Sequence, residues 1–205
     1  MHRDRFILGI VSIILAAIGI ASPVQAGPGD EPIPIHAIQF TTAPDGASPL
    51  AGQTVTTQGI VAAVYRQGYV IAEPAGGPWS GIYVYDPEHL PALGDELLLH
   101  AEVTEYFGLT ELTNIQQFLL LARRQSLPPA VRVPCGAMAA EAYEGVLIDL
   151  GQVSVTSVEL GFGDWEVSDG SGTARVGSRT DIWYLPHAGD ALAFLRGVVY
   201  YSYGA

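Results

Sequence analysis

The sequence of 205 residues contains no lysine, and its net charge is strongly negative. Its positive side chains are 9 arginines, against 21 Asp and Glu residues, which gives a formal net charge of −12 at pH 7. Clustered Lys and Arg attract phosphate backbones and anionic lipids, so an acidic surface without lysine resists association with either. Any polyanion site must therefore depend on arginines gathered at one place.

Only one cysteine, Cys135, is present, so no intrachain disulfide can form. With 49% hydrophobic residues, the stability must come from apolar cores. No histidine lies near Cys135 in the sequence to stabilise a thiolate, and we interpret it as a buried or idle thiol. The sequence has no metal-site spacing of His and carboxylates, no Gly-x-Ser-x-Gly elbow and no phosphate loop. We therefore expect no enzymatic activity, no metal and no cofactor.

A long apolar run is also missing, because the run at residues 6–20 is short for a membrane span. It follows a charged stretch that contains two arginines, and Val24-Gln25-Ala26 supplies the small residues of a cleavage site. We interpret residues 1–26 as a secretory signal peptide; the alternative is an uncleaved anchor. The mature protein is expected to be secreted, to the periplasm or the exterior, with no stable membrane insertion.

Glycine and proline are abundant, with 24 and 14 residues, which is typical of many strands and turns. Residues 27–34 are predicted to be a disordered leader, and residues 35–40 a short strand. Five further strands are predicted at 53–65, 69–73, 81–85, 96–106 and 109–123. They indicate a small barrel over residues 35–125. A stiff proline-rich linker, residues 126–136, then precedes a second domain at residues 137–205.

The two predicted domains align with each other at a spacing of about 95 residues, which indicates an internal repeat. The corresponding segments are 69–73 with 165–169, 90–95 with 185–190, and 106–108 with 202–204. The first copy continues through a further strand after Gly108, and the second copy has no counterpart of it before Ala205. We therefore expect two small barrels of one kind, the second lacking its last strand. An open sheet edge of this type is prone to association.

Several motifs carry a resemblance to a known family. In the first half they are 50–61 (LAGQTVTTQGIV), 68–71 (GYVI), 81–85 (GIYVY), 94–95 (GD) and 105–112 (EYFGLTEL). They resemble, in order, the OB-fold domains of secreted bacterial nucleases. The second half is similar to the segment that follows this domain in the same nucleases, through 141–148 (EAYEGVLI) and 196–204 (RGVVYYSYG).

The resemblance implies an all-β fold of two tandem OB-fold-like barrels, the second incomplete, and an accessory nucleic-acid-binding role. The family's catalytic domain is a metal-dependent phosphodiesterase of the endonuclease/exonuclease/phosphatase type, and residues 1–205 contain no match to it. The resemblance therefore gives no catalytic residue to this chain, which is expected to be a module or a fragment of a longer nuclease.

OB-folds bind single strands on their second and third strands, where aromatic rings stack on bases and basic groups contact phosphate. Alternation along residues 81–85 places Tyr83 and Tyr85 on one face and leaves Ile82 and Val84 for the core. Tyrosines on a sheet face can equally serve only for cross-strand packing. The predicted nucleic-acid-binding residues are Tyr65, Arg66, Tyr69, Trp79, Tyr83 and Tyr85.

Two other functions stay open. One is a protein-interaction or scaffold module that receives a strand from a partner chain at the open edge of the second barrel. The other is saccharide binding, since OB barrels use the same loops for oligosaccharides. The fold alone does not choose between these and single-stranded nucleic acid.

Overall fold

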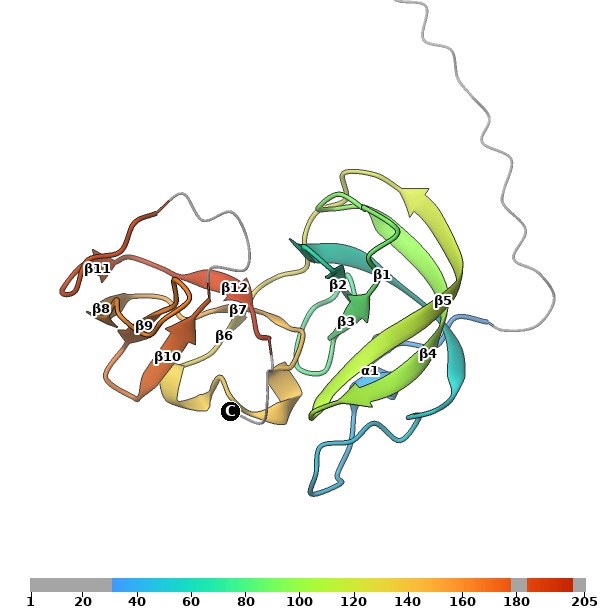
Figure 1. Cartoon of the computed structure of the whole chain (residues 1–205), viewed down its shortest axis with the longest axis horizontal. Helices are drawn as coiled ribbons and strands as arrows, with labels where there is room; N and C mark the ends of the chain where they lie inside the picture. Colours follow the sequence, from blue (N-terminus) through green and yellow to red (C-terminus); the bar gives the residue numbers. More distant parts are fainter. Residues whose placement is uncertain (1–30, 178–183, 201–205) are drawn as a thin grey trace, which may run out of the picture.

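The computed structural model describes residues 31–177 and 184–200 (Figure 1). The predicted signal peptide, residues 1–26, lies outside these ranges. Strands dominate the described residues, which contain one short α-helix, α1 (Ile35–Gln39), and two 3-10 helices, η1 (Cys135–Ala137) and η2 (Glu141–Tyr143). The all-β class is therefore confirmed. Within the described ranges, no helix combines the length and apolar character needed to cross a membrane.

The first half is a closed barrel. Its strands are β1 (Thr54–Tyr65), β2 (Gly68–Ala72), β3 (Gly81–Tyr85), β4 (Glu96–Tyr106) and β5 (Leu109–Ala122). They close in the order β1-β2-β3-β5-β4, with β3 and β5 parallel and the other neighbours antiparallel. All five strands match the ranges predicted from the sequence to within one residue at either end.

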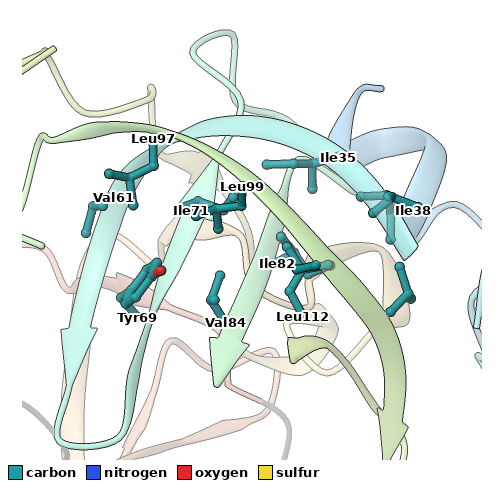
Figure 2. Close-up of a cluster of buried hydrophobic side chains, with 13 residues drawn as sticks. Ile35, Ile38, Val61, Tyr69, Ile71, Ile82, Val84, Leu97, Leu99 and Leu112 are labelled. Atoms are coloured by element: carbon teal, nitrogen blue, oxygen red, sulfur yellow. The ribbon is translucent and has the colours of Figure 1, made fainter. Parts of the chain in front are cut away.

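Alternation along the strands builds the barrel core. Ile71, Ile82 and Leu97 point inward from three different strands, as Figure 2 shows, and each is fully buried. Burying one such side chain contributes about 1.5–3 kcal/mol. Ile35 and Ile38 of α1 join the same core and close one end of the barrel.

The prediction of a strand at residues 35–40 is wrong, since this segment forms α1. Pro34 precedes the helix, and its carbonyl accepts a hydrogen bond from the Ala37 N–H at 3.0 Å. Ile35 and Ile38, three residues apart, lie on one face of the turn and pack into the barrel together. Ile33, which was predicted to lie in a disordered leader, instead forms a parallel bridge with Thr57.

The second half contains two open sheets around its own core. Its strands are β6 (Val131–Arg132), β7 (Leu147–Asp149), β8 (Val153–Ser157), β9 (Trp165–Ser168), β10 (Thr173–Val176), β11 (Ala191–Leu192) and β12 (Arg196–Val198). One sheet has the order β10-β9-β8-β11, and the other has the order β12-β7-β6. The shared core includes Val146, Val153, Val167 and Val199. That these sheets are a second barrel of the first kind stays a prediction.

Part of the predicted linker at residues 126–136 belongs to the second half. Val131 and Arg132 form β6, which runs parallel to β7. Val133 and Cys135 are buried in the core of the second half. The proline-rich composition of this segment made the alternating apolar residues Val131, Val133 and Cys135 difficult to recognise as a strand, because they pack only against the sheet of the second half.

The two halves share several local backbone arrangements. Each half starts with a parallel strand contact followed by a helical turn capped by proline, Pro34 in one and Pro134 in the other. Each half also has a Gly-Asp corner, Gly94-Asp95 or Gly189-Asp190, bonded twice to one valine of the first long strand. The bonds are Val61 N to Asp95 O (2.8 Å) and Gly94 N to Val61 O (2.9 Å), then Val155 N to Asp190 O (2.8 Å) and Gly189 N to Val155 O (2.9 Å).

The two halves meet at a contact that we call the junction, formed by Gly81, Tyr83, Glu144, Gly145 and Tyr200. A Cβ atom added to Gly81 would lie 1.9 Å from the carbonyl oxygen of Gly145, so no larger residue fits there. The Thr110 N–H donates to Oε1 of Glu144 at 3.0 Å, and the Trp79 N–H donates to the Ala142 carbonyl at 2.7 Å. These contacts set the second half against the β2–β3 side of the barrel (Figure 1).

Candidate functional site

Three tyrosines gather on the outer side of the β1-β2-β3 sheet, and we call them the tyrosine face: Tyr65, Tyr83 and Tyr85. Gly68 pairs in register with Tyr65 on one side and with Tyr85 on the other. A Cβ at Gly68 would lie 2.8 Å from the Tyr83 hydroxyl, so glycine leaves the space that this ring occupies. Ile82 and Val84 point into the core, as alternation predicted.

Tyr83, at the centre of the face, is covered by the second half. It is only 6% exposed and packs edge-on against Tyr65 and Tyr200, with centroid distances of 6.0 and 5.5 Å. Val198 belongs to the same cluster. Burial, and then the proximity of Tyr200, raise the pKa of the Tyr83 hydroxyl. The prediction that Tyr83 offers an open stacking surface is therefore wrong for this arrangement of the halves.

Tyr69 is a core residue, and its predicted role in stacking on a ligand is wrong. Its ring lies inside the barrel (Figure 2), only 1% exposed, and its hydroxyl donates a 3.0 Å hydrogen bond to Asp86. Burial, and then the Asp86 carboxylate, raise its pKa, so it stays a neutral donor. Alternation from Ile71 in the same strand already places Tyr69 on the inner side.

Trp79 is half-buried and contacts a different set of rings. It packs edge-on against Phe40 at 5.6 Å, and Phe40 stacks on His36 at 5.4 Å. Its backbone has a φ of 67°, in the left-handed region that is rare for bulky residues. The backbone hydrogen bond to Ala142 across the junction accompanies this conformation, so Trp79 serves the junction and not the tyrosine face.

The accessible part of the predicted site is its rim, made of Tyr65, Arg66 and Tyr85. Tyr85 is 43% exposed, Arg66 is exposed, and Tyr65 is half-buried. Four other described arginines are paired with aspartates: Arg123 with Asp95, Arg132 and Arg196 with Asp149, and Arg175 with Asp164. Arg66 has no ion pair among the described residues, and it is the cation that adjoins the tyrosine face.

A carboxyl group lies next to this face and modifies its charge. Glu111 of β5 is in register with Tyr83 and is buried. Burial, and then the neighbouring Glu105, raise the pKa of Glu111 to about 7. Below neutral pH the group is therefore mostly protonated, and the negative potential beside the tyrosines falls.

Metal and nucleophile chemistry have little support in the described ranges. There, no three His, Cys, Asp or Glu side chains are arranged to hold a metal ion. Cys135 is buried in the second half, and burial raises the pKa of its thiol, which keeps it in the unreactive protonated form.

The sequence did not reveal the residues that cover the tyrosine face. Tyr200 and Val198 come from the second half, more than 100 residues from Tyr83 in the chain. Glu144 and Gly145 of the junction were predicted to begin a long strand at residues 144–158, whereas the structure begins β7 at Leu147. Their role depends on a contact between the halves, for which the sequence carries no periodic pattern.

Comparisons with known proteins add little. No protein-family model matches the chain, and no curated protein matches it. A solved structure described as an aspartyl-tRNA synthetase from Leishmania major Friedlin is similar over 50% of this chain and 23% of that chain, at 11% identity and a TM-score of 0.36. A likeness this slight does not bear on fold or function.

Proposed function

We propose that this chain is an exported, non-catalytic module that binds single-stranded nucleic acid at the accessible rim of the tyrosine face, as the accessory part of a secreted nuclease. The observation that carries the proposal is the position of the face. A closed five-stranded barrel leaves Tyr85 and part of Tyr65 accessible on the outer side of β1–β3, and OB-type barrels hold single strands on their second and third strands.

The rim provides the contacts that a single strand needs. Base stacking on an aromatic side chain contributes about 1–3 kcal/mol per base, and it tolerates any sequence. Tyr85 and the open part of Tyr65 would stack bases, and the Arg66 guanidinium would meet a phosphate between them. One cation in an acidic protein supports weak binding, which suits a module that positions substrate for a separate catalytic domain.

Tyr85→Ala tests the proposal in the mature chain, residues 27–205, by fluorescence anisotropy of a labelled oligothymidylate at low salt. Loss of one stacked base weakens binding about 5- to 150-fold, the equivalent of 1–3 kcal/mol. Arg66→Ala should also flatten the dependence of log K on log salt by about 0.7, the value for one phosphate contact on a single strand.

The matched control is Tyr106→Ala, which removes another exposed tyrosine at the far end of β4. Its affinity should equal that of the unmodified protein. Equal losses in the Tyr85 and Tyr106 variants, or no detectable binding at low salt, would refute the proposed function.

A further inference from the structure

Three charged side chains form a row across one face of the sheet β12-β7-β6. Asp149 of β7 is in register with Arg196 of β12 on one side and with Arg132 of β6 on the other. Residues in register on neighbouring strands point to the same face of a sheet. Val131 and Ile148, which precede two members of the row, belong to the core of the second half, so the row lies on the outer face. We call these three residues the Arg-Asp-Arg row.

The aspartate holds both arginines but balances the charge of only one. Oδ2 of Asp149 accepts a hydrogen bond from Nε of Arg196 at 2.8 Å, and Oδ1 accepts one from Nη1 of Arg132 at 3.4 Å. The hydrogen bond from Arg196 is the largest cause that lowers the pKa of the Asp149 carboxyl, so this group stays ionised at neutral pH. Two positive groups and one negative group leave a single net positive charge in the row.

Each guanidinium group is also positioned by a second contact. The Arg196 guanidinium lies over the Phe194 ring, with Cζ 5.3 Å from the ring centroid. A Cβ atom added to Gly151 would lie 1.7 Å from Nη2 of Arg132, so glycine leaves the space that this guanidinium occupies. Both side chains nevertheless remain more than half exposed. Nη1 and Nη2 of Arg196 make no hydrogen bond within the part of the chain that the structure describes, and they can donate to an anion.

The row continues the surface of the tyrosine face. Val198 follows Arg196 by two residues, so alternation places both side chains on the same face of β12. Val198 packs in the cluster that contains Tyr65 and Tyr83. At a rise of about 3.3 Å per residue, Arg196 lies about 7 Å farther along β12 than Val198. A single strand at the rim of the tyrosine face can reach this distance, since an OB fold holds about 4–16 nucleotides.

Phosphate is the anion that suits this arrangement. The donors of a guanidinium group match the spacing of phosphate oxygens, and charge strengthens each of these hydrogen bonds. We propose that the Arg-Asp-Arg row is a phosphate site, at which Arg132 and Arg196 hold a backbone phosphodiester of the single strand whose bases stack at the rim. The inference rests on the proposed function and extends it, because it adds a phosphate contact in the second half to the one at Arg66. A strand bound in this way spans both halves of the protein.

The experiment measures binding of a labelled oligothymidylate of about 16 nucleotides to the mature chain, residues 27–205, by fluorescence anisotropy. Arg132→Ala and Arg196→Ala should each weaken binding about fivefold to tenfold at about 50 mM salt, and should flatten the dependence of log K on log salt by about 0.7. The double variant should lose no more of the salt dependence than either single variant, because both arginines contact the same phosphate.

Arg175→Ala is the matched control. Arg175 lies in the same half, its side chain is 58% exposed, and it is paired with Asp164 alone, so its charge is already balanced. The substitution changes the net charge by the same amount as Arg196→Ala, yet the affinity and the salt dependence should not change. Exposed ion pairs contribute little to stability, so all these variants should fold.

A second readout needs no variant. Heteronuclear NMR spectra resolve the Nε–H groups of the arginines. On addition of the same oligothymidylate, the signals of Arg132 and Arg196 should shift, and the signal of Arg175 should not. Signals of Arg132 and Arg196 that do not move while the oligothymidylate binds overturn the phosphate site.

The outcomes separate this inference from the proposed function. Binding that depends on Tyr85 but not on Arg132 or Arg196 overturns the phosphate site and leaves the proposed function standing. Equal losses in the Arg175 and Arg196 variants show a general effect of net charge, and they also overturn the phosphate site. Absence of any binding at low salt refutes the proposed function, and the phosphate site with it.

Discussion

Glu144→Gln is the most informative single change, because Glu144 sits at the junction with half of its carboxyl group unsatisfied. The side chain is 4% exposed; Oε1 accepts the Thr110 N–H, and Oε2 has no hydrogen-bond partner among the described residues. Burial, and then the neighbouring Glu141 carboxylate, raise its pKa to about 8. Glu105 is a further acid that acts on Glu144, and none of the ion pairs among the described residues joins an arginine to these carboxylates.

A carboxyl whose folded-state pKa is raised binds its proton more tightly in the folded protein. Its contribution to stability is therefore complete below pH 4.5 and is lost as the pH rises to about 8. A shift of roughly three and a half pKa units, at about 1.4 kcal/mol per unit, sets an upper limit of about 5 kcal/mol on this loss. Local opening of the junction can relieve the buried charge, so a loss of about 2–5 kcal/mol is expected between pH 5 and pH 9.

The assay is urea unfolding of residues 27–205 at pH 5, 7 and 9, followed by tryptophan fluorescence. Glu144→Gln keeps an acceptor for Thr110 and removes the titration, so most of the pH dependence should disappear. Glu111, with its pKa of about 7, and Glu141, whose pKa is also raised by burial, account for the remainder. Glu159→Gln is the control, since it removes one negative charge from an exposed position away from the junction. A free energy of unfolding that is flat from pH 5 to pH 9, or an equal slope in both variants, contradicts the reasoning.

Two further predictions concern stability and are checked by urea unfolding at pH 7. Tyr69→Phe removes the buried hydroxyl that donates to Asp86 and should cost about 1–3 kcal/mol; a loss below about 0.5 kcal/mol would contradict this account of the core. Asp95→Ala and Asp190→Ala remove the same corner carboxylate, which accepts a backbone N–H three residues earlier in each half. Loss of the buried Asp95 carboxylate should cost about 1–3 kcal/mol, and loss of the half-buried Asp190 carboxylate clearly less. Equal losses would show that burial does not determine the stabilisation from the corner carboxylate.

The sequence was sufficient to predict the five strands of the barrel. Runs such as 81–85 alternate between apolar and tyrosine residues, and glycine or acidic turn residues mark their ends, so strand limits follow from local chemistry. The repeat stays a prediction, although two of the motifs that indicate it, Gly94-Asp95 and Gly189-Asp190, make the same backbone hydrogen bonds. The prediction of a strand at residues 35–40 was wrong because six residues are too few for periodicity to distinguish a strand from a helical turn.

The candidate site was predicted only in part, and the reasons differ by residue. The inward position of Tyr69 follows from alternation with Ile71, so the sequence contained enough information to exclude Tyr69 from the ligand-stacking residues. The covering of Tyr83 by Tyr200 does not follow from any local pattern, because it depends on how the two halves pack. Arg66 and Tyr85 are at the rim of the face, where the prediction and the structure agree on exposure.

The position of Cys135 makes the second half observable on its own. The sequence has one cysteine, and that side chain is 2% exposed in the core that the turn after Pro134 closes. A thiol reagent can reach Cys135 only when this turn detaches from the sheets. The rate of alkylation therefore reports local unfolding of the second half and not of the barrel, which has no cysteine. A proton lost from the junction would change that rate, and the native thiol reports the change without an engineered cysteine.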